Sequence, residues 1–126
     1  MFERTNGKDS IFGFNATHRV YIGRANKAYQ LKQSPLANPF VIGRDGSREQ
    51  VVSLYRRWLW EQVKEGMAGK PNAAWNELKS LQRYAKKLMY DLDFGELELT
   101  CWCPESELCH GDVIVKCLEW MNKNNL

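Results

Sequence analysis

Apolar and polar residues alternate along residues 96–103, and this period of two predicts a half-buried β-strand. Pro104 cannot donate a hydrogen bond to a neighbouring strand, so the strand is expected to end there. Apolar residues then recur at helical spacing, which predicts a final helix from Gly111 or Asp112, with Asp112 as its N-cap. The residues expected on the buried face of the strand are Leu97, Leu99, Cys101 and Cys103.

Two longer helices are predicted in the middle of the chain. Residues 47–50 read Ser-Arg-Glu-Gln, which is a capping box, and the apolar residues after it follow a helical period as far as Val63. The segment from Gly66 to Pro71 is expected to break this helix. A second amphipathic helix is expected over about residues 72–90.

The N-terminal third is expected to supply the other strands of the sheet. Residues 19–24 predict a core strand that ends at a glycine, and a long loop follows it. Residues 1–18 are expected to form an arm or a short edge strand. Because two strands alone make a thin sheet, a third strand is expected from residues 10–15 or 40–42.

The order of these elements indicates one small α/β domain over residues 19–126. We expect a short, mainly parallel sheet of two to four strands, flanked by about three helices. Parallel strands open their carboxyl ends at the same edge of a sheet, where α/β proteins bind ligands. The strand ends at Arg24 and Cys103 are therefore expected to lie side by side.

Composition narrows the class of protein. With 126 residues, 44% hydrophobic and 26% charged, the chain has the composition of a single soluble domain. No apolar run reaches the length of a membrane helix, and the N-terminal residues lack a signal-peptide core, so we expect no membrane association. The clustered cysteines are unlike a secreted disulfide framework, which favours the cytoplasm. The net charge of +3 permits an anionic partner, and a homo-oligomer stays open.

Three cysteines and a histidine follow the predicted strand closely. By residue type, Cys101, Cys103, Cys109 and His110 could form a Cys3His zinc site. The spacing argues against the simplest version. Sulfurs that share one zinc ion lie about 3.8 Å apart, whereas residues i and i+2 of an extended strand have Cα atoms about 6.6 Å apart. Zinc therefore stays an alternative to a buried, structural role for Cys101.

The same group could perform covalent or acid–base chemistry. Cys103 lies at the exit of the strand, and Cys109 precedes a helix whose N-terminus can lower the pKa of a thiol. His110 could accept the thiol proton, whereas Glu105 and Glu107 would disfavour a thiolate. The alternative is that Cys109 packs beneath the loop and His110 binds loop carbonyls.

A third possibility is a cleft for a small nucleotide- or nucleoside-like anion. Gly23 allows close backbone approach, and Arg24 could pair with a phosphate or carboxylate. Asn38 could recognise a base or sugar, and Asp112, at the helix N-terminus, could accept a ribose hydroxyl or act as a base. The alternative is an Arg24–Asp112 salt bridge that only joins loop to helix. The selected residues are Cys103, His110 and Asp112 for catalysis, and Gly23, Arg24, Asn38, Phe40, Cys109 and Gly111 for ligand binding.

The rival function is interaction with nucleic acid or protein without catalysis. Basic residues lie along the outer face of the second predicted helix, and such a stripe can follow phosphates. The same pattern is also typical of a solvated helix face. Trp60 and Trp102 could stack a base or cover a partner surface. The basic residues are Lys79, Arg83, Lys86 and Lys87, with Arg56 and Arg57 on the first helix.

Five short motifs occur in order along the chain. They are Val-Tyr-Ile-Gly-Arg at 20–24, Asn-Pro-Phe-Val-Ile-Gly at 38–43, Tyr-Arg-Arg-Trp-Leu at 55–59, Cys-Trp-Cys-Pro at 101–104 and Cys-His-Gly-Asp-Val at 109–113. This series resembles domain-of-unknown-function family 4326, whose members are small domains of bacteria and their phages. The resemblance covers about residues 19–118, and Ala37 stands where the family usually has glycine.

The resemblance implies one compact domain with its functional edge at these motifs, and it brings no assigned reaction. We therefore expect a domain that binds a nucleotide-like ligand, with hydrolysis or transfer of that ligand left open. The alternative is a non-enzymatic interaction module of the kind that acts in phage takeover of a host or against host defence, with a structural zinc ion as an option.

Overall fold

The computed structural model of the chain describes residues 2–8, 11–93 and 95–126. It confirms a small α/β domain built from three strands and three α-helices. In chain order these are β1 (Phe2–Asn6), β2 (Arg19–Tyr21), the 3-10 helix η1 (Lys27–Tyr29), α1 (Arg48–Met67), α2 (Ala73–Tyr90), β3 (Leu97–Cys101) and α3 (His110–Lys123).

The sheet has the strand order β1-β3-β2, and both neighbours run parallel to β3. The parallel pairing of β2 with β3 confirms the expectation for strands joined through helices. The third strand comes from residues 1–18, which were expected to form an arm or a short edge strand, and the expectation of a third strand at 10–15 or 40–42 was wrong. This third strand is β1, at one edge of the sheet; residues 11–15 and 40–42 form no strand, and residue 10 lies outside the described residues.

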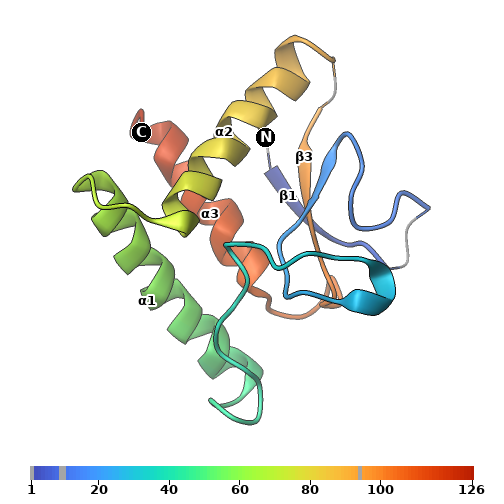
Figure 1. Cartoon of the computed structure of the whole chain (residues 1–126), viewed down its shortest axis with the longest axis vertical. Helices are drawn as coiled ribbons and strands as arrows, with labels where there is room; N and C mark the ends of the chain where they lie inside the picture. The colour runs from blue at the N-terminus through green and yellow to red at the C-terminus, as the bar shows by residue number, and fades with distance from the viewer. Residues whose placement is uncertain (1, 9–10, 94) are drawn as a thin grey trace.

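The helices cover one face of the sheet, and N-terminal loops lie on the other side (Figure 1). Leu97 and Leu99 point from β3 into the helical side, where both are fully buried. Burial of a leucine side chain contributes about 1.5–3 kcal/mol, so this central strand anchors the core. On the loop side, the Thr100 hydroxyl donates to the Phe14 carbonyl at 2.6 Å. The small cluster on that side consists of Phe14, Tyr21 and Leu31, with Trp102 packed against it.

Capping residues set where the two long helices begin. The Ser47 hydroxyl accepts from the Gln50 N–H, and the Gln50 side chain accepts from the Ser47 N–H, which confirms the predicted capping box of α1. The Asn72 side chain accepts the Trp75 N–H at 2.9 Å and so caps α2.

The start of α3 differs from the prediction. Cys109, not Asp112, is the N-cap, and its sulfur accepts the Gly111 N–H at 3.4 Å. Asp112 occupies the third helical position, and its carboxylate accepts the Cys109 N–H at 3.1 Å. The pair is therefore a capping box in which a cysteine replaces the usual serine or threonine.

The end of β3 also differs from the prediction. The strand ends at Cys101, and the chain bends at Trp102 and Cys103 instead of continuing to Pro104. Because of this bend, the distance of about 6.6 Å between residues i and i+2 of an extended strand does not apply to Cys101 and Cys103. Their two sulfurs can therefore lie closer together.

None of the described helices combines the length and the apolar character that crossing a membrane requires.

Candidate ligand-binding cleft

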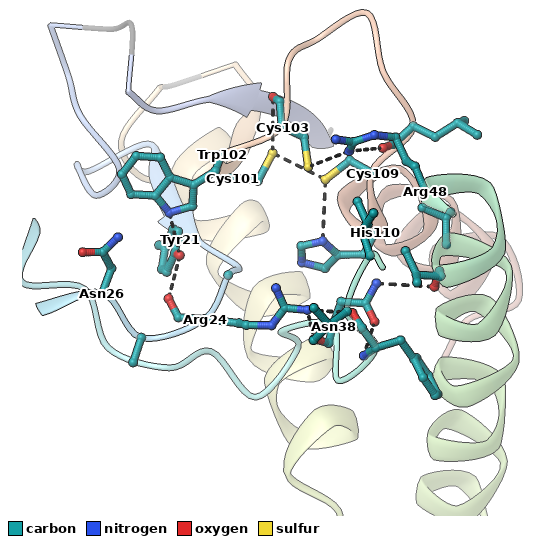
Figure 2. A pocket seen from close by; sticks show the side chains of 18 residues that line it. Tyr21, Arg24, Asn26, Asn38, Arg48, Cys101, Trp102, Cys103, Cys109 and His110 are labelled. Atoms are coloured by element: carbon teal, nitrogen blue, oxygen red, sulfur yellow. Dashed lines mark hydrogen bonds between the residues drawn. The ribbon is translucent and has the colours of Figure 1, made fainter. Parts of the chain in front are cut away.

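A cleft of about 400 Å³ opens where the carboxyl ends of β2 and β3 meet the N-termini of α1 and α3 (Figure 2). The segments that form it lie far apart in sequence, as expected for the edge of a parallel sheet. The lining residues are Tyr21, Gly23, Arg24, Ala25, Asn26, Asn38, Phe40, Val41, Ile42, Arg48, Val51, Val52, Cys101, Trp102, Cys103, Leu108, Cys109 and His110.

Most of the residues selected from the sequence line this cleft. Asp112 and Gly111 are not among its described lining residues. Asp112 instead lines a second cavity, together with Glu3 and Arg4. The selected residues brought together at the cleft are Gly23, Arg24, Asn38, Phe40, Cys101, Cys103, Cys109 and His110.

Arg24 holds the loop on the opposite wall of the cleft. One of its terminal nitrogens, Nη2, donates to the carbonyl oxygens of Asn38 at 2.8 Å and Phe40 at 2.6 Å. The proposed pairing of Arg24 with Asp112 is wrong, because the Asp112 carboxylate pairs with Arg4 at 2.9 Å. Both loop contacts of Arg24 come from a single nitrogen of this exposed guanidinium.

The buried side chain of Asn38 shapes the loop. Its oxygen accepts the Phe40 N–H at 2.9 Å, and its nitrogen donates to the Val51 carbonyl at 3.4 Å. The side chain thus replaces backbone partners inside a turn, which is a common use of asparagine. Asn38 lines the cleft as a structural element, and both ends of its amide are engaged.

Gly23 allows a close approach, and the group that approaches is the chain's own Tyr21. A Cβ atom at position 23 would lie 2.6 Å from Cζ of the Tyr21 ring. The Tyr21 hydroxyl donates to the Arg24 carbonyl at 2.7 Å and accepts from the Trp102 indole N–H at 2.9 Å. Glycine at this position therefore lets a tyrosine and a tryptophan form one aromatic wall of the cleft.

Arg48 was missed as a site residue by the sequence reasoning. It is the first residue of α1, and its Nη1 donates to the Cys103 sulfur at 3.6 Å and to the Leu108 carbonyl at 3.1 Å. Its Nη2 pairs with the Glu107 carboxylate at 2.9 Å. Figure 2 shows Arg48 beside the three thiols, across the cleft from Trp102. The sequence did indicate that Arg48 begins a helix, because it directly follows the predicted N-cap Ser47.

Three thiols meet in the wall of the cleft. The sulfurs of Cys101 and Cys109 are 3.5 Å apart, and those of Cys101, Cys103 and Cys109 all lie within 4.8 Å of one another. Hydrogen bonds from Cys101 and Cys109 lower the pKa of Cys103, and Arg48 adds to this effect. The same coupling raises the pKa of Cys101 and of Cys109. These contacts therefore favour ionisation at Cys103 over ionisation at Cys101 or Cys109.

His110 is buried behind the thiols. Its Nε2 lies 2.8 Å from the Ile22 carbonyl oxygen, to which it donates, so the lone pair is on Nδ1. Nδ1 lies 3.6 Å from the Cys109 sulfur. Burial lowers the pKa of His110, which keeps the ring neutral at neutral pH.

The loop that carries Cys103 is wrapped around Arg4, a second residue that the sequence reasoning missed. The guanidinium donates to the Cys103 and Pro104 carbonyls at 3.4 and 3.3 Å. It donates to the Glu105 and Glu107 carbonyls at 3.0 Å each. A polar residue near the N-terminus gives no local signal of this role, which depends on pairing of β1 with β3.

A protein-family model described as Domain of unknown function (DUF4326) matches residues 10–120. The chain belongs to this family. The match confirms the resemblance drawn from the ordered motifs, and it spans every residue that lines the cleft of this DUF4326 domain. No curated protein and no solved structure shows a significant match to the chain.

Two further surfaces of the DUF4326 domain bear on the rival function. Arg83, Lys86 and Lys87 are exposed along α2, whereas the Lys79 ammonium lies 5.6 Å from the centre of the Trp75 ring. Elsewhere, Trp60 and Trp120 form an edge-to-face pair with 46% and 36% of their surfaces exposed. Trp102, in contrast, belongs to the cleft.

Proposed function

We propose that the cleft binds a small anionic molecule that carries a planar group, of the nucleotide or nucleoside class. The observation that carries this proposal is the lining of one cavity at the carboxyl edge of a parallel sheet: two guanidinium groups and an aromatic wall face the same space. Small-molecule sites typically have volumes of about 300–1,000 Å³, and the 400 Å³ of this cleft suits a nucleotide-sized ligand.

Charge favours an anion. Arg24 and Arg48 are the basic side chains among the described lining residues, which include no aspartate or glutamate. Glu107 offsets part of the charge of Arg48 from outside the cleft. A phosphate or carboxylate would gain charge-assisted hydrogen bonds from guanidinium groups that the fold already holds in place.

The aromatic wall favours a planar group. The hydrogen bond from the Trp102 indole to the Tyr21 hydroxyl fixes the ring, which is half-buried and lines the cleft. An ordered indole loses little conformational freedom when a base stacks on it, and base–aromatic stacking contributes about 1–3 kcal/mol. Phe40 lines the cleft as well.

Hydrolysis or transfer of the bound molecule would draw on Cys103, because its thiol lies in the wall of the cleft and its pKa is lowered. His110 lines the same wall. Asp112 is engaged with Arg4 and the Cys109 N–H, so we assign it the support of Arg4 and the helix cap instead of proton transfer.

Calorimetric titration with AMP, adenosine and inorganic phosphate tests the proposal. AMP should bind more tightly than adenosine or phosphate alone, because it meets both the arginines and the aromatic wall. Arg24→Gln and Arg48→Gln should each weaken AMP binding by about tenfold, which corresponds to 1.4 kcal/mol.

Arg57→Gln is the matched control, since Arg57 is an exposed arginine of the same helix as Arg48 and is not among the residues of the cleft. It should leave the affinity unchanged. Equal loss in all three variants would show that AMP responds only to net charge, and absence of binding by AMP, GMP, CMP and UMP would refute a nucleotide site.

Nucleic-acid binding is the second candidate, and the exposed basic residues of α2 are the observation that favours it. Phosphate contacts would make such binding strongly dependent on salt. The double variant Arg83→Gln with Lys86→Gln would then weaken binding to single-stranded DNA or RNA and reduce its salt dependence, while AMP binding stayed unchanged.

A further inference from the structure

The three sulfurs at the wall of the cleft have the spacing of a metal site. Ligands of a tetrahedral zinc ion with Zn–S bonds of about 2.3 Å lie about 3.8 Å apart. The sulfurs of Cys101 and Cys109 are 3.5 Å apart, and the whole group of three lies within 4.8 Å. The objection drawn from an extended Cys-x-Cys pair does not apply, because β3 ends at Cys101 and the chain bends at Cys103.

Every one of the three sulfurs also has an N–H group directed at it. A thiolate bound to a metal keeps partial negative charge, and donors around it stabilise that charge and orient the ligand. Two donors are arginine side chains from β1 and α1, and the third is a backbone amide at the start of α3. The pairs are Arg4 Nη1 to Cys101 Sγ at 3.8 Å, Arg48 Nη1 to Cys103 Sγ at 3.6 Å and Gly111 N to Cys109 Sγ at 3.4 Å.

Contacts within the chain position these sulfurs. Arg4 binds four carbonyl groups of residues 103–107, and Asp112 holds Arg4 through Nε. Cys109 is fixed as the N-cap of α3, and Cys101 ends the central strand. The three sulfurs are therefore positioned by residues of three different segments, and they face one another as a set of ligands.

We propose that Cys101, Cys103 and Cys109 bind one Zn²⁺ ion, with the fourth coordination position open to the cleft. Three neighbouring thiols cannot all ionise on their own, because like charges at this distance repel. A divalent cation removes that repulsion, and soft thiolate ligands select zinc over magnesium or calcium. Three thiolates and one Zn²⁺ ion carry a net charge of −1, and Arg4 and Arg48 donate hydrogen bonds to two of these sulfurs.

The open position follows from the surroundings of the group. All three cysteines line the cleft. His110 Nδ1 lies 3.6 Å from the Cys109 sulfur, but it is not part of the group whose ligand atoms all lie within 4.8 Å of one another. Three protein ligands with an exchangeable fourth ligand are typical of zinc sites that act on a substrate. The zinc site does not require the proposed nucleotide ligand, and each proposal can fail without the other.

Titration of the reduced, metal-free protein with Co²⁺ tests the site directly. We expect one Co²⁺ per chain and an intense thiolate-to-cobalt charge-transfer band, which one equivalent of Zn²⁺ abolishes. Cys101→Ser, Cys103→Ser and Cys109→Ser should each lower the affinity for Co²⁺ by at least tenfold. Cys117→Ser is the control and should bind as the wild type does, because Cys117 lies outside the group of three.

Alkylation of the wild-type protein gives a second measurement that needs no variant to fold. Zn²⁺ should protect the peptides that carry Cys101, Cys103 and Cys109 and leave the rate at Cys117 unchanged. A wild-type protein that develops no charge-transfer band with Co²⁺, or in which Zn²⁺ protects none of the three cysteines, overturns the proposal. Retention of the full band in all three serine variants does so too.

Discussion

Arg4 Nε lies 2.9 Å from Asp112 Oδ1. This ion pair joins β1 to α3 beside the loop of residues 103–107. The Arg4 side chain is 6% exposed, and that of Asp112 is 41% exposed. The guanidinium also donates to four carbonyl groups of residues 103–107. Substitution of Arg4 should therefore lower the unfolding free energy more than substitution of Asp112. Arg4→Lys keeps the charge but not the planar array of donors, so we expect a loss of about 3 kcal/mol in unfolding free energy, measured by urea denaturation.

Asp112→Asn is the comparison for that variant. The amide oxygen can still accept one N–H, and solvent screens the exposed carboxylate, so we expect a loss of about 1 kcal/mol. A loss from Asp112→Asn as large as that from Arg4→Lys would show that the ion pair, and not the carbonyl contacts, holds the loop.

Gly111 lies where Arg4 passes the start of α3. A Cβ atom there would lie 2.8 Å from Arg4 Cδ and 2.9 Å from Ile22 Cδ1. We expect Gly111→Ala to displace both side chains and to lower the unfolding free energy by about 1–3 kcal/mol, despite the higher helix propensity of alanine. Gly95→Ala is the control, because nothing lies within 4 Å of its Cβ position. Equal melting temperatures of the two variants would contradict this close packing.

Asp45 should make the stability of the loop beside the cleft depend on pH. Its carboxylate accepts the Val41 N–H at 2.8 Å and pairs with Arg44 at 2.9 Å, and these contacts lower the pKa of Asp45 from 3.8. A carboxyl group whose pKa is lower in the folded state stabilises the fold above its unfolded pKa. That stabilisation is lost as the pH falls through the folded pKa.

The variant that tests this is Asp45→Ala. It should melt slightly below the wild type at neutral pH, and the difference in melting temperature should shrink as the pH falls below 3.8. A difference that is constant across this range would show that the carboxylate charge has no part in stabilising the loop.

Cys117 should react slowly in the native protein. Burial raises the pKa of Cys117 from 9.0 to about 11, which lowers its thiolate fraction at neutral pH by about 100-fold. Alkylation with iodoacetamide, followed peptide by peptide with mass spectrometry, should be about 100-fold slower at Cys117 in the native protein than in urea. Similar rates in the two conditions would contradict the raised pKa of this thiol.

The helices were predictable because their signals are local. The Ser47–Gln50 capping box and the helical period of the apolar residues depend only on nearby sequence, and both appear in α1. The bounds of β1 within residues 1–18 were not predictable, because Phe2 is the only apolar residue among its five and no alternation marks the strand. Its buried position comes from pairing with β3, almost a whole chain length away.

The site was predictable to the level of its segments. Gly23, Arg24 and the thiol motif meet at one edge of the sheet, as parallel pairing requires. The individual contacts were not predictable, because they depend on the conformation of each side chain in the folded protein. The Asp112 carboxylate pairs with Arg4. The Asn38 side chain forms its hydrogen bonds with the backbone of Phe40 and Val51. The position of Cys103 depends on a bend that the pattern of alternation does not show.

A titration of isotope-labelled protein with AMP, followed by two-dimensional amide NMR, tests the central claim most directly. The account predicts that the signals shifted by AMP belong to the cleft, with the Trp102 indole N–H and the amides of Arg24 and Cys103 among them. Shifts confined to α2 or to the Trp60–Trp120 surface, or no shift at saturating AMP, would contradict a ligand site at this edge of the sheet.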